Sequence, residues 1–246
     1  PLSRGWYLSA MCQALHEVAH GRERRLQITV PPRHLKSIMT TVAFPAWLLG
    51  QRPETRIICA SYGQELSAAL SRSFRKVIQS RWYSEVFPQT AASIIRDTEA
   101  DLGTRQGGYR FATAVGGTVT GIGADLIIID DLMKAQDASY PEARAKAQRF
   151  VDETLLSRLD NKQTGAVIAI QQRLHEDDVS AHLSSKGGYR HLDLPAIAMR
   201  DEPRTDAVQG LAMLKESGVK IIMLTGDNRR TADAIGQTLG IEVRAE

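Results

Sequence analysis

The stretch LQITVPPRHLKS, residues 26–37, runs from an apolar strand into a turn that carries Arg33, Lys36 and Ser37. It is a variant of the phosphate-binding pattern G-x-x-x-x-G-K-[ST], whose glycines let the backbone curl around phosphates. The Lys of that pattern reaches the outer phosphates, and its hydroxyl residue holds Mg²⁺. Here Leu35 replaces the second glycine and Pro31 opens the loop. Because such a string is also typical of a solvated turn, the rest of the chain has to decide between the two interpretations.

Apolar strand patterns alternate with helical patterns along the chain. Besides the strand in 26–37, short β-rich runs predict strands at 56–60, 124–131, 166–170 and 191–194, and a strand or hairpin at 107–117. Helical spacing predicts helices at 6–18, 38–49, 65–78 and 141–159, with Pro45 expected to kink or shorten the second. This order predicts an α/β fold with a parallel sheet flanked by helices.

Polar residues follow two of the predicted strands directly. ADLIIIDD, residues 124–131, is apolar until it ends in Asp130 and Asp131, and AVIAI, residues 166–170, is followed by the polar run 171–175. Strands that are apolar on both faces belong to parallel sheets, whose ligands bind at the carboxyl ends. A strand-terminal turn would also explain an Asp pair. A second such cluster at the carboxyl end of a parallel strand favours a ligand site.

Together these residues offer each group that nucleotide hydrolysis needs. Lys36 and Ser37 would bind phosphates and Mg²⁺, Asp130 would support the metal, and Asp131 would position the attacking water. Arg33 or Arg173 would sense the γ-phosphate. The combination predicts an ATPase that uses ATP and Mg²⁺.

Composition is that of an ordinary globular protein of 246 residues, 43% of them hydrophobic. Lys and Arg number 31 against 28 Asp and Glu, and the pI is about 9.0. The basic residues Arg22, Arg24 and Arg25, and a second group at 72–81, would either contact a polyanion or lie on solvated faces. Without a secretory signal or an apolar run of roughly 20 residues, the sequence predicts a cytoplasmic protein with no membrane segment. Because the first residue is Pro1, the chain can be part of a longer reading frame.

Several motifs occur in one order, namely PPRHLKS, ICASYGQELS, WYSEVFP, GGTVTGIGADLIIIDDLMKA, TLLSRL and QQRLHEDD followed by LPAIA. Over about residues 5–198 they resemble the ATPase domain of the large terminase subunit of tailed bacteriophages. The resemblance implies a P-loop NTPase of the ASCE type, a motor that drives double-stranded DNA into a procapsid. It also implies a portal protein and a small terminase subunit as partners, and a homo-oligomeric ring in the host cytoplasm.

In the terms of that family, residues 33–37 are a variant Walker A loop, and Asp130 and Asp131 are the Walker B acids. The resemblance thus implies that Arg33, His34, Leu35, Lys36 and Ser37 bind the nucleotide, together with Gln172 of the coupling motif 171–175.

Departures from the family pattern concern three positions. Leu35 in place of glycine occurs in the family, whereas Asp131 stands where Glu is common. Relatives often carry an arginine finger beside Gly121, where this chain has Thr120 and Ile122. The family's RNase H-like nuclease, which follows LPAIA, is not expected from this chain.

From residue 205 the sequence reads TDAVQGLAMLKESGVKIIMLTGDNRRTADAIGQTLGIEVRAE. It predicts a helix at 206–217, a strand at 220–224 and a helix at 229–239, a partial HAD or Rossmann-like βα fragment. The fragment resembles part of the phosphorylation domain of heavy-metal P-type ATPases, whose TGDN motif matches Thr225, Gly226 and Asp227. The DKTGT segment of that domain, which bears the phosphorylated Asp, does not occur in the chain.

The predicted organisation is therefore a terminase-like ATPase domain at 1–198, a junction at 199–204 and the fragment at 205–246. Two other functions stay open: a piece of a heavy-metal cation-transporting P-type ATPase, or an inactive chimeric relic that binds ATP without turnover.

Overall fold

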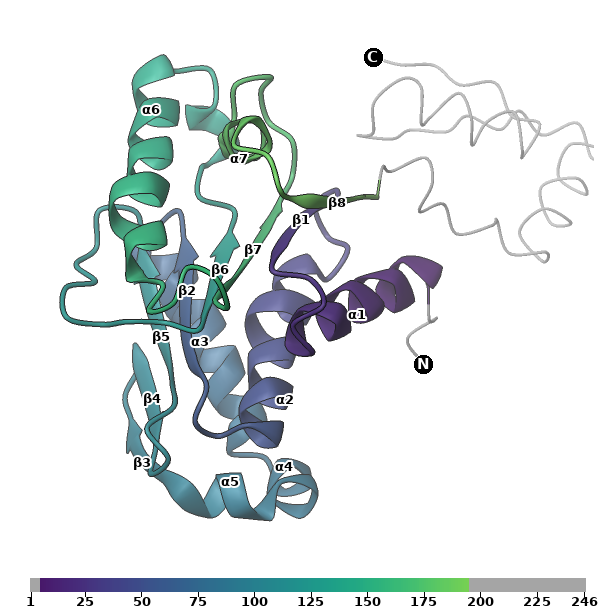
Figure 1. Ribbon diagram of the computed structural model, residues 1–246, viewed down its shortest axis with the longest axis vertical. Coiled ribbons are helices and arrows are strands. Elements are labelled where there is room, and N and C mark those ends of the chain that lie inside the picture. The colour runs from purple at the N-terminus through teal and green to yellow at the C-terminus, as the bar shows by residue number, and fades with distance from the viewer. Residues whose placement is uncertain (1–4, 195–246) are drawn as a thin grey trace, which may run out of the picture. The chain divides into compact units, whose positions relative to one another are not determined.

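Eight strands form one sheet in the order β3-β4-β5-β2-β6-β7-β1-β8 (Figure 1). The computed structural model describes residues 5–194, and the structural statements below concern this range. The strands are β1 (Arg25–Thr29), β2 (Arg56–Ser61), β3 (Ile94–Asp97), β4 (Asp101–Thr104), β5 (Tyr109–Ala114), β6 (Leu126–Asp130), β7 (Ala166–Gln171) and β8 (Arg190–Asp193). All neighbours from β5 to β8 in this order pair in parallel, whereas β4 pairs antiparallel with both β3 and β5.

Six of the eight strands, from β5 to β8 in this order, form a parallel sheet flanked by helices. This confirms the predicted α/β fold class. The hairpin of β3 and β4 was not predicted, because its strands are short and its residues 96–101 are mostly polar. The range 107–117 forms the single strand β5 rather than a hairpin of its own.

The helices are α1 (Trp6–Ala19), α2 (Phe44–Gln51), α3 (Gln64–Ile78), α4 (Arg81–Val86), α5 (Pro88–Ser93), α6 (Pro141–Arg149) and α7 (Val179–Ser185). Two π-helices, η1 (Ile38–Ala43) and η3 (Phe150–Leu155), and two 3₁₀ turns, η2 (Ala135–Asp137) and η4 (Leu156–Arg158), complete the described elements. The helix predicted at 38–49 is thus η1 followed by α2. Pro45 lies in the first turn of α2, where a backbone N–H is not needed.

Side-chain alternation divides the sheet into two faces. One face carries Ile58, Ala60, Ile127, Ile129, Val167 and Ala169, which are cross-strand partners and pack with α6, η3 and α7. Figure 1 shows α6 and α7 on this side and α1, α2 and α3 on the other. Because successive side chains point to opposite faces, Asp130 points away from α6, toward η1, which contacts β6.

The predicted junction 199–204 and the fragment 205–246, with Thr225, Gly226 and Asp227, lie outside the described residues, so the proposed domain boundaries stay a prediction. Among the helices of residues 5–194, none is long and apolar enough to cross a membrane.

Candidate nucleotide-binding site

The phosphate-loop candidate connects the carboxyl end of β1 with η1. Arg33 and Leu35 both adopt left-handed backbone conformations, with φ of 67° and 57°. Leu35 occupies the position at which the general pattern has glycine, the residue that adopts this conformation without steric cost. The loop therefore has the backbone shape that the missing glycine would supply. Lys36, next in the chain, is buried.

Asp130 ends β6 and is fully buried. Its Oδ1 accepts a hydrogen bond from Ser37 Oγ at 2.9 Å, and its Oδ2 accepts one from Thr41 Oγ1 at 2.6 Å. Ser37 and Thr41 lie four residues apart and so present their hydroxyls on one side of the helical segment. Burial, followed by the neighbouring charge of Asp131, raises the pKa of Asp130 to about 6, and the two hydroxyl hydrogen bonds partly offset this rise.

Asp131 connects the loop to two strands. Its Oδ2 lies 2.5 Å from Nζ of Lys36, its Oδ1 accepts from the backbone N–H of Gln172 at 3.1 Å, and its carbonyl accepts from the N–H of Tyr62 at 3.0 Å. Asp131 has a φ of 44°. Asp tolerates this left-handed region better than most residues with longer side chains, which suits Asp to this position.

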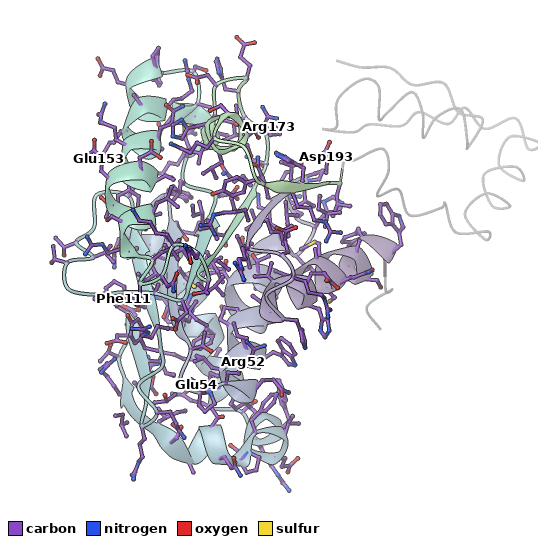
Figure 2. The ribbon with its side chains drawn as sticks, in the orientation of Figure 1. Arg52, Glu54, Phe111, Glu153, Arg173 and Asp193 are labelled. Atoms are coloured by element: carbon purple, nitrogen blue, oxygen red, sulfur yellow. The ribbon has the colours of Figure 1, made fainter. Side chains whose placement is uncertain are left out.

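Lys36, Ser37, Asp130, Asp131 and the backbone of Gln172 are thus brought together at the carboxyl ends of β1, β6 and β7. The predicted phosphate sensors are not part of this cluster. Arg33 is exposed and forms no ion pair within residues 5–194. Arg173 donates from Nε to Oδ2 of Asp178 at 3.0 Å, beside α7 (Figure 2).

His34, also predicted to bind the nucleotide, lies in the loop with its ring edge-on to Tyr7 of α1, at 5.5 Å between centroids. Its Nδ1 lies 2.8 Å from the carbonyl oxygen of Pro32. The roles predicted for Arg33, His34 and Arg173 stay predictions.

Three further residues lie in or beside the site, and of these only Gln171 belonged to a predicted motif, the run 171–175. Thr41 was signalled only by its spacing of four from Ser37. Gln171, at the end of β7, is buried, and its Nε2 has no partner among the described residues. Asp178 was detectable as an N-cap residue: its Oδ1 accepts from the N–H of Ala181 at 2.9 Å at the start of α7.

The oxygen atoms of Ser37 and Asp130 suit Mg²⁺, a cation that prefers hard oxygen ligands. Within residues 5–194 no three His, Cys, Asp or Glu side chains form a group that could hold a metal alone. Mg²⁺ is usually bound through one or two carboxylates together with substrate phosphates and water. The residues therefore fit a Mg²⁺ ion that arrives with a nucleotide.

A model of the haloacid dehalogenase-like hydrolases matches residues 108–246, which are 139 of the 246 residues. Over these residues the chain belongs to that hydrolase family. The match begins just before β5, includes β6 and β7 with Asp130 and Asp131, and continues into residues outside the described range.

Curated relatives of the chain include copper-transporting P-type ATPases. The probable copper-importing P-type ATPase A of Enterococcus hirae is 45% identical over 49 residues, which are 20% of this chain and 7% of that protein. The copper-transporting P-type ATPase of Rhizobium leguminosarum bv. viciae is 54% identical over 54 residues, 22% of this chain and 6% of that protein. The copper-exporting P-type ATPase of Bacillus subtilis is 34% identical over 86 residues, 35% of this chain and 10% of that protein. The chain thus spans a tenth or less of each of these relatives. They support the resemblance predicted for the fragment at 205–246.

Among solved structures, the large terminase of bacteriophage HK97 is similar to this chain with a TM-score of 0.55 and 14% sequence identity. The similarity covers 97% of this chain and 47% of the terminase. At this identity the comparison shows a shared fold, and it supports the terminase-like architecture predicted from the motifs.

Proposed function

We propose that residues 5–194 form an ATP-hydrolysing motor domain of the terminase large-subunit type. The observation that carries the proposal is the convergence of Lys36, Ser37, Asp130 and Asp131 at the carboxyl ends of β1 and β6. Their contacts, at 2.5 Å for Lys36 with Asp131 and 2.9 Å for Ser37 with Asp130, join a phosphate loop to a pair of carboxylates. The fold shared with the HK97 large terminase supports the same function.

In this proposal the Lys36 ammonium binds the terminal phosphates of ATP, and the loop backbone follows them. Bound Mg²⁺ would neutralise phosphate charge, with Ser37 and Asp130 as its protein ligands. Phosphate binding draws Lys36 away from Asp131, because the same ammonium serves both anions. The released Asp131 carboxylate, still held by the Gln172 N–H, then accepts a proton from the attacking water. A bond forms between the water oxygen and the γ-phosphorus as the bond to ADP breaks.

Double-stranded DNA is the proposed polymer that the motor moves, with a portal protein, a small terminase subunit and further copies of this chain as assembly partners. The arginines of the two basic groups differ in their partners, and Arg22 of the first group pairs with Glu17 at 2.5 Å. Arg72, Arg75 and Arg81 form ion pairs with Glu99, Asp97 and Glu85 at 2.6, 2.5 and 2.8 Å. Arg24 and Arg25 instead donate to the backbone carbonyls of Gln163 and Gly165, and neither pairs with a carboxylate of the described residues. We therefore assign DNA phosphate contacts to Arg24 and Arg25.

A second candidate function is phosphoryl transfer by a P-type ATPase fragment. It is favoured by the hydrolase family match over 108–246 and by the copper-transporting relatives. Such a fragment would form a covalent aspartyl phosphate, whereas the motor domain would transfer the phosphoryl group directly to water.

Incubation of the full chain with γ-labelled ATP and Mg²⁺, followed by acid quenching, distinguishes these functions. The motor proposal expects labelled phosphate in solution and no acid-stable label on the protein. Acid-stable labelled protein would favour the P-type fragment. Nucleotide binding without either product would favour an inactive relic.

A further inference from the structure

Thr41 contacts the site carboxylate on one side and a buried arginine on the other. Its Oγ1 donates to Oδ2 of Asp130 at 2.6 Å, and its carbonyl oxygen accepts from an Nη2–H of Arg110 at 3.3 Å. The exposed fractions of Thr41, Asp130 and Arg110 are 1%, 0% and 1%. A buried chain of hydrogen bonds therefore connects β5, which carries Arg110, through η1 to the end of β6.

Arg110 is an unusual residue for this position in the core. Its Nη1 donates to Ser71 Oγ at 3.1 Å, and its guanidinium lies 4.8 Å from the centroid of the Phe74 ring. It forms no ion pair with a carboxylate of the described residues, and its Nε has no partner among them. Burying a guanidinium is costly unless its donors are used. One of these donors bonds the carbonyl oxygen of Thr41, and an apolar side chain in place of Arg110 could not make this hydrogen bond.

Thr41 itself lies in η1, a π-helical segment that follows the phosphate loop directly. Such segments are rare and occur frequently at functional sites. The segment places Ser37 and Thr41 so that each hydroxyl holds one oxygen of Asp130. If Ser37 used its hydroxyl to hold a metal ion, Asp130 would lose one of these two bonds. The bond from Thr41 would then be the one that still orients the carboxylate.

We infer that Thr41 and Arg110 are positioning residues: Thr41 orients Asp130 toward Mg²⁺, and Arg110 fixes Thr41. The inference rests on the proposed function, in which Asp130 supports the metal. Removing a hydrogen-bond partner of a ligating carboxylate typically weakens metal affinity about ten- to hundredfold. The expected effect therefore lies in the Mg²⁺ concentration that the protein requires.

The test uses the full chain loaded with a nonhydrolysable ATP analogue and measures Tm while Mg²⁺ is titrated. Thr41→Val keeps the branched shape but removes the hydroxyl, and we expect it to raise the Mg²⁺ midpoint of the Tm increase about tenfold or more. Thr41→Ser keeps the hydroxyl and should restore the wild-type midpoint. Arg110→Met should shift the midpoint in the same direction, and the double variant should be no worse than Thr41→Val if both act through one path.

Thr90→Val is the matched control. Thr90 is also buried, and its hydroxyl donates to the carbonyls of Leu49 and Gly50 at 3.3 and 3.2 Å, away from Asp130. It should lower Tm without moving the Mg²⁺ midpoint. The inference is overturned if Thr41→Val shifts the midpoint no more than Thr90→Val does, or if Thr41→Ser shifts it as far as Thr41→Val.

Failure of the proposed function has a different result in the same experiment. If the wild-type chain shows no Mg²⁺-dependent rise in Tm with the analogue, or if Lys36→Ala shows the full rise, residues 5–194 do not bind Mg²⁺ and nucleotide as proposed. If the wild type responds, Lys36→Ala does not, and Thr41→Val matches the wild type, only the positioning inference fails.

Discussion

Asp130→Asn should stabilise the nucleotide-free protein increasingly as pH rises. In the folded protein the pKa of Asp130 is raised from 3.8 to about 6, so the fold favours the protonated carboxyl. The stability that this protonated group contributes is fully present below about pH 3.8 and is lost as pH rises through about 6. At about 1.4 kcal/mol per pKa unit, the complete loss is ~3 kcal/mol.

Asn has nearly the same shape and carries no charge, so it does not undergo this loss. One of its two polar atoms is an N–H₂ group, and Ser37 or Thr41 must then accept rather than donate. That exchange costs about 1 kcal/mol at every pH. The diagnostic quantity is therefore the slope of the stability difference against pH, rather than its value at one pH.

Urea unfolding followed by tryptophan fluorescence measures this slope, and the three tryptophans, Trp6, Trp47 and Trp82, all lie within residues 5–194. In EDTA without nucleotide, we expect the stability of Asp130→Asn relative to wild type to rise by roughly 1–2 kcal/mol between about pH 5 and pH 8. Asp160→Asn removes an exposed carboxylate paired with Arg56 at 2.9 Å and should show no such gain. A pH-independent difference for Asp130→Asn would refute the argument that its ionisation opposes folding.

Leu35→Gly should be more stable than Leu35→Ala by about 1 kcal/mol in thermal unfolding, because both lose the side chain but only glycine relieves the φ of 57°; equal stabilities would contradict the strained loop. Asp131→Asn should bind ATP more tightly in a fluorescent-nucleotide titration while losing turnover, because Lys36 no longer has to leave a carboxylate 2.5 Å away; weaker binding would count against that competition. Replacing Arg24 and Arg25 by Glu should weaken binding to double-stranded DNA and reduce its salt dependence by about two phosphate contacts, and an unchanged salt slope would remove them from the interface.

The sequence predicted β6 and β7, two of the strands that position the site, because both are apolar on both faces. For β6 and β7 this pattern located both the sheet and the polar residues that follow each strand. Asp130 and Asp131 were predictable as neighbours of Lys36 and Ser37 because the carboxyl ends of parallel strands lie at one edge.

Other features depend on tertiary contacts that no local pattern encodes. Arg110 lies in an alternating strand and gives no sign in the sequence that its guanidinium is buried between Ser71 and Phe74. The ion pair of Arg173 with Asp178 is also a contact that the sequence did not predict. The positive φ of Asp131 likewise could not be predicted from the sequence.

The central claim is that Lys36 belongs to an ATP-hydrolysing site. Its most direct test is phosphate release from Mg·ATP by the purified full chain, compared with Lys36→Ala. Lys186→Ala is the matched control, since it also breaks a Lys–Asp pair, with Asp152 at 3.0 Å, but at the C-terminal end of α7. We predict a fall of at least about a hundredfold in Lys36→Ala, the loss typical of removing a key electrostatic group, and near wild-type turnover in Lys186→Ala. Equal turnover in wild type and Lys36→Ala would contradict the account.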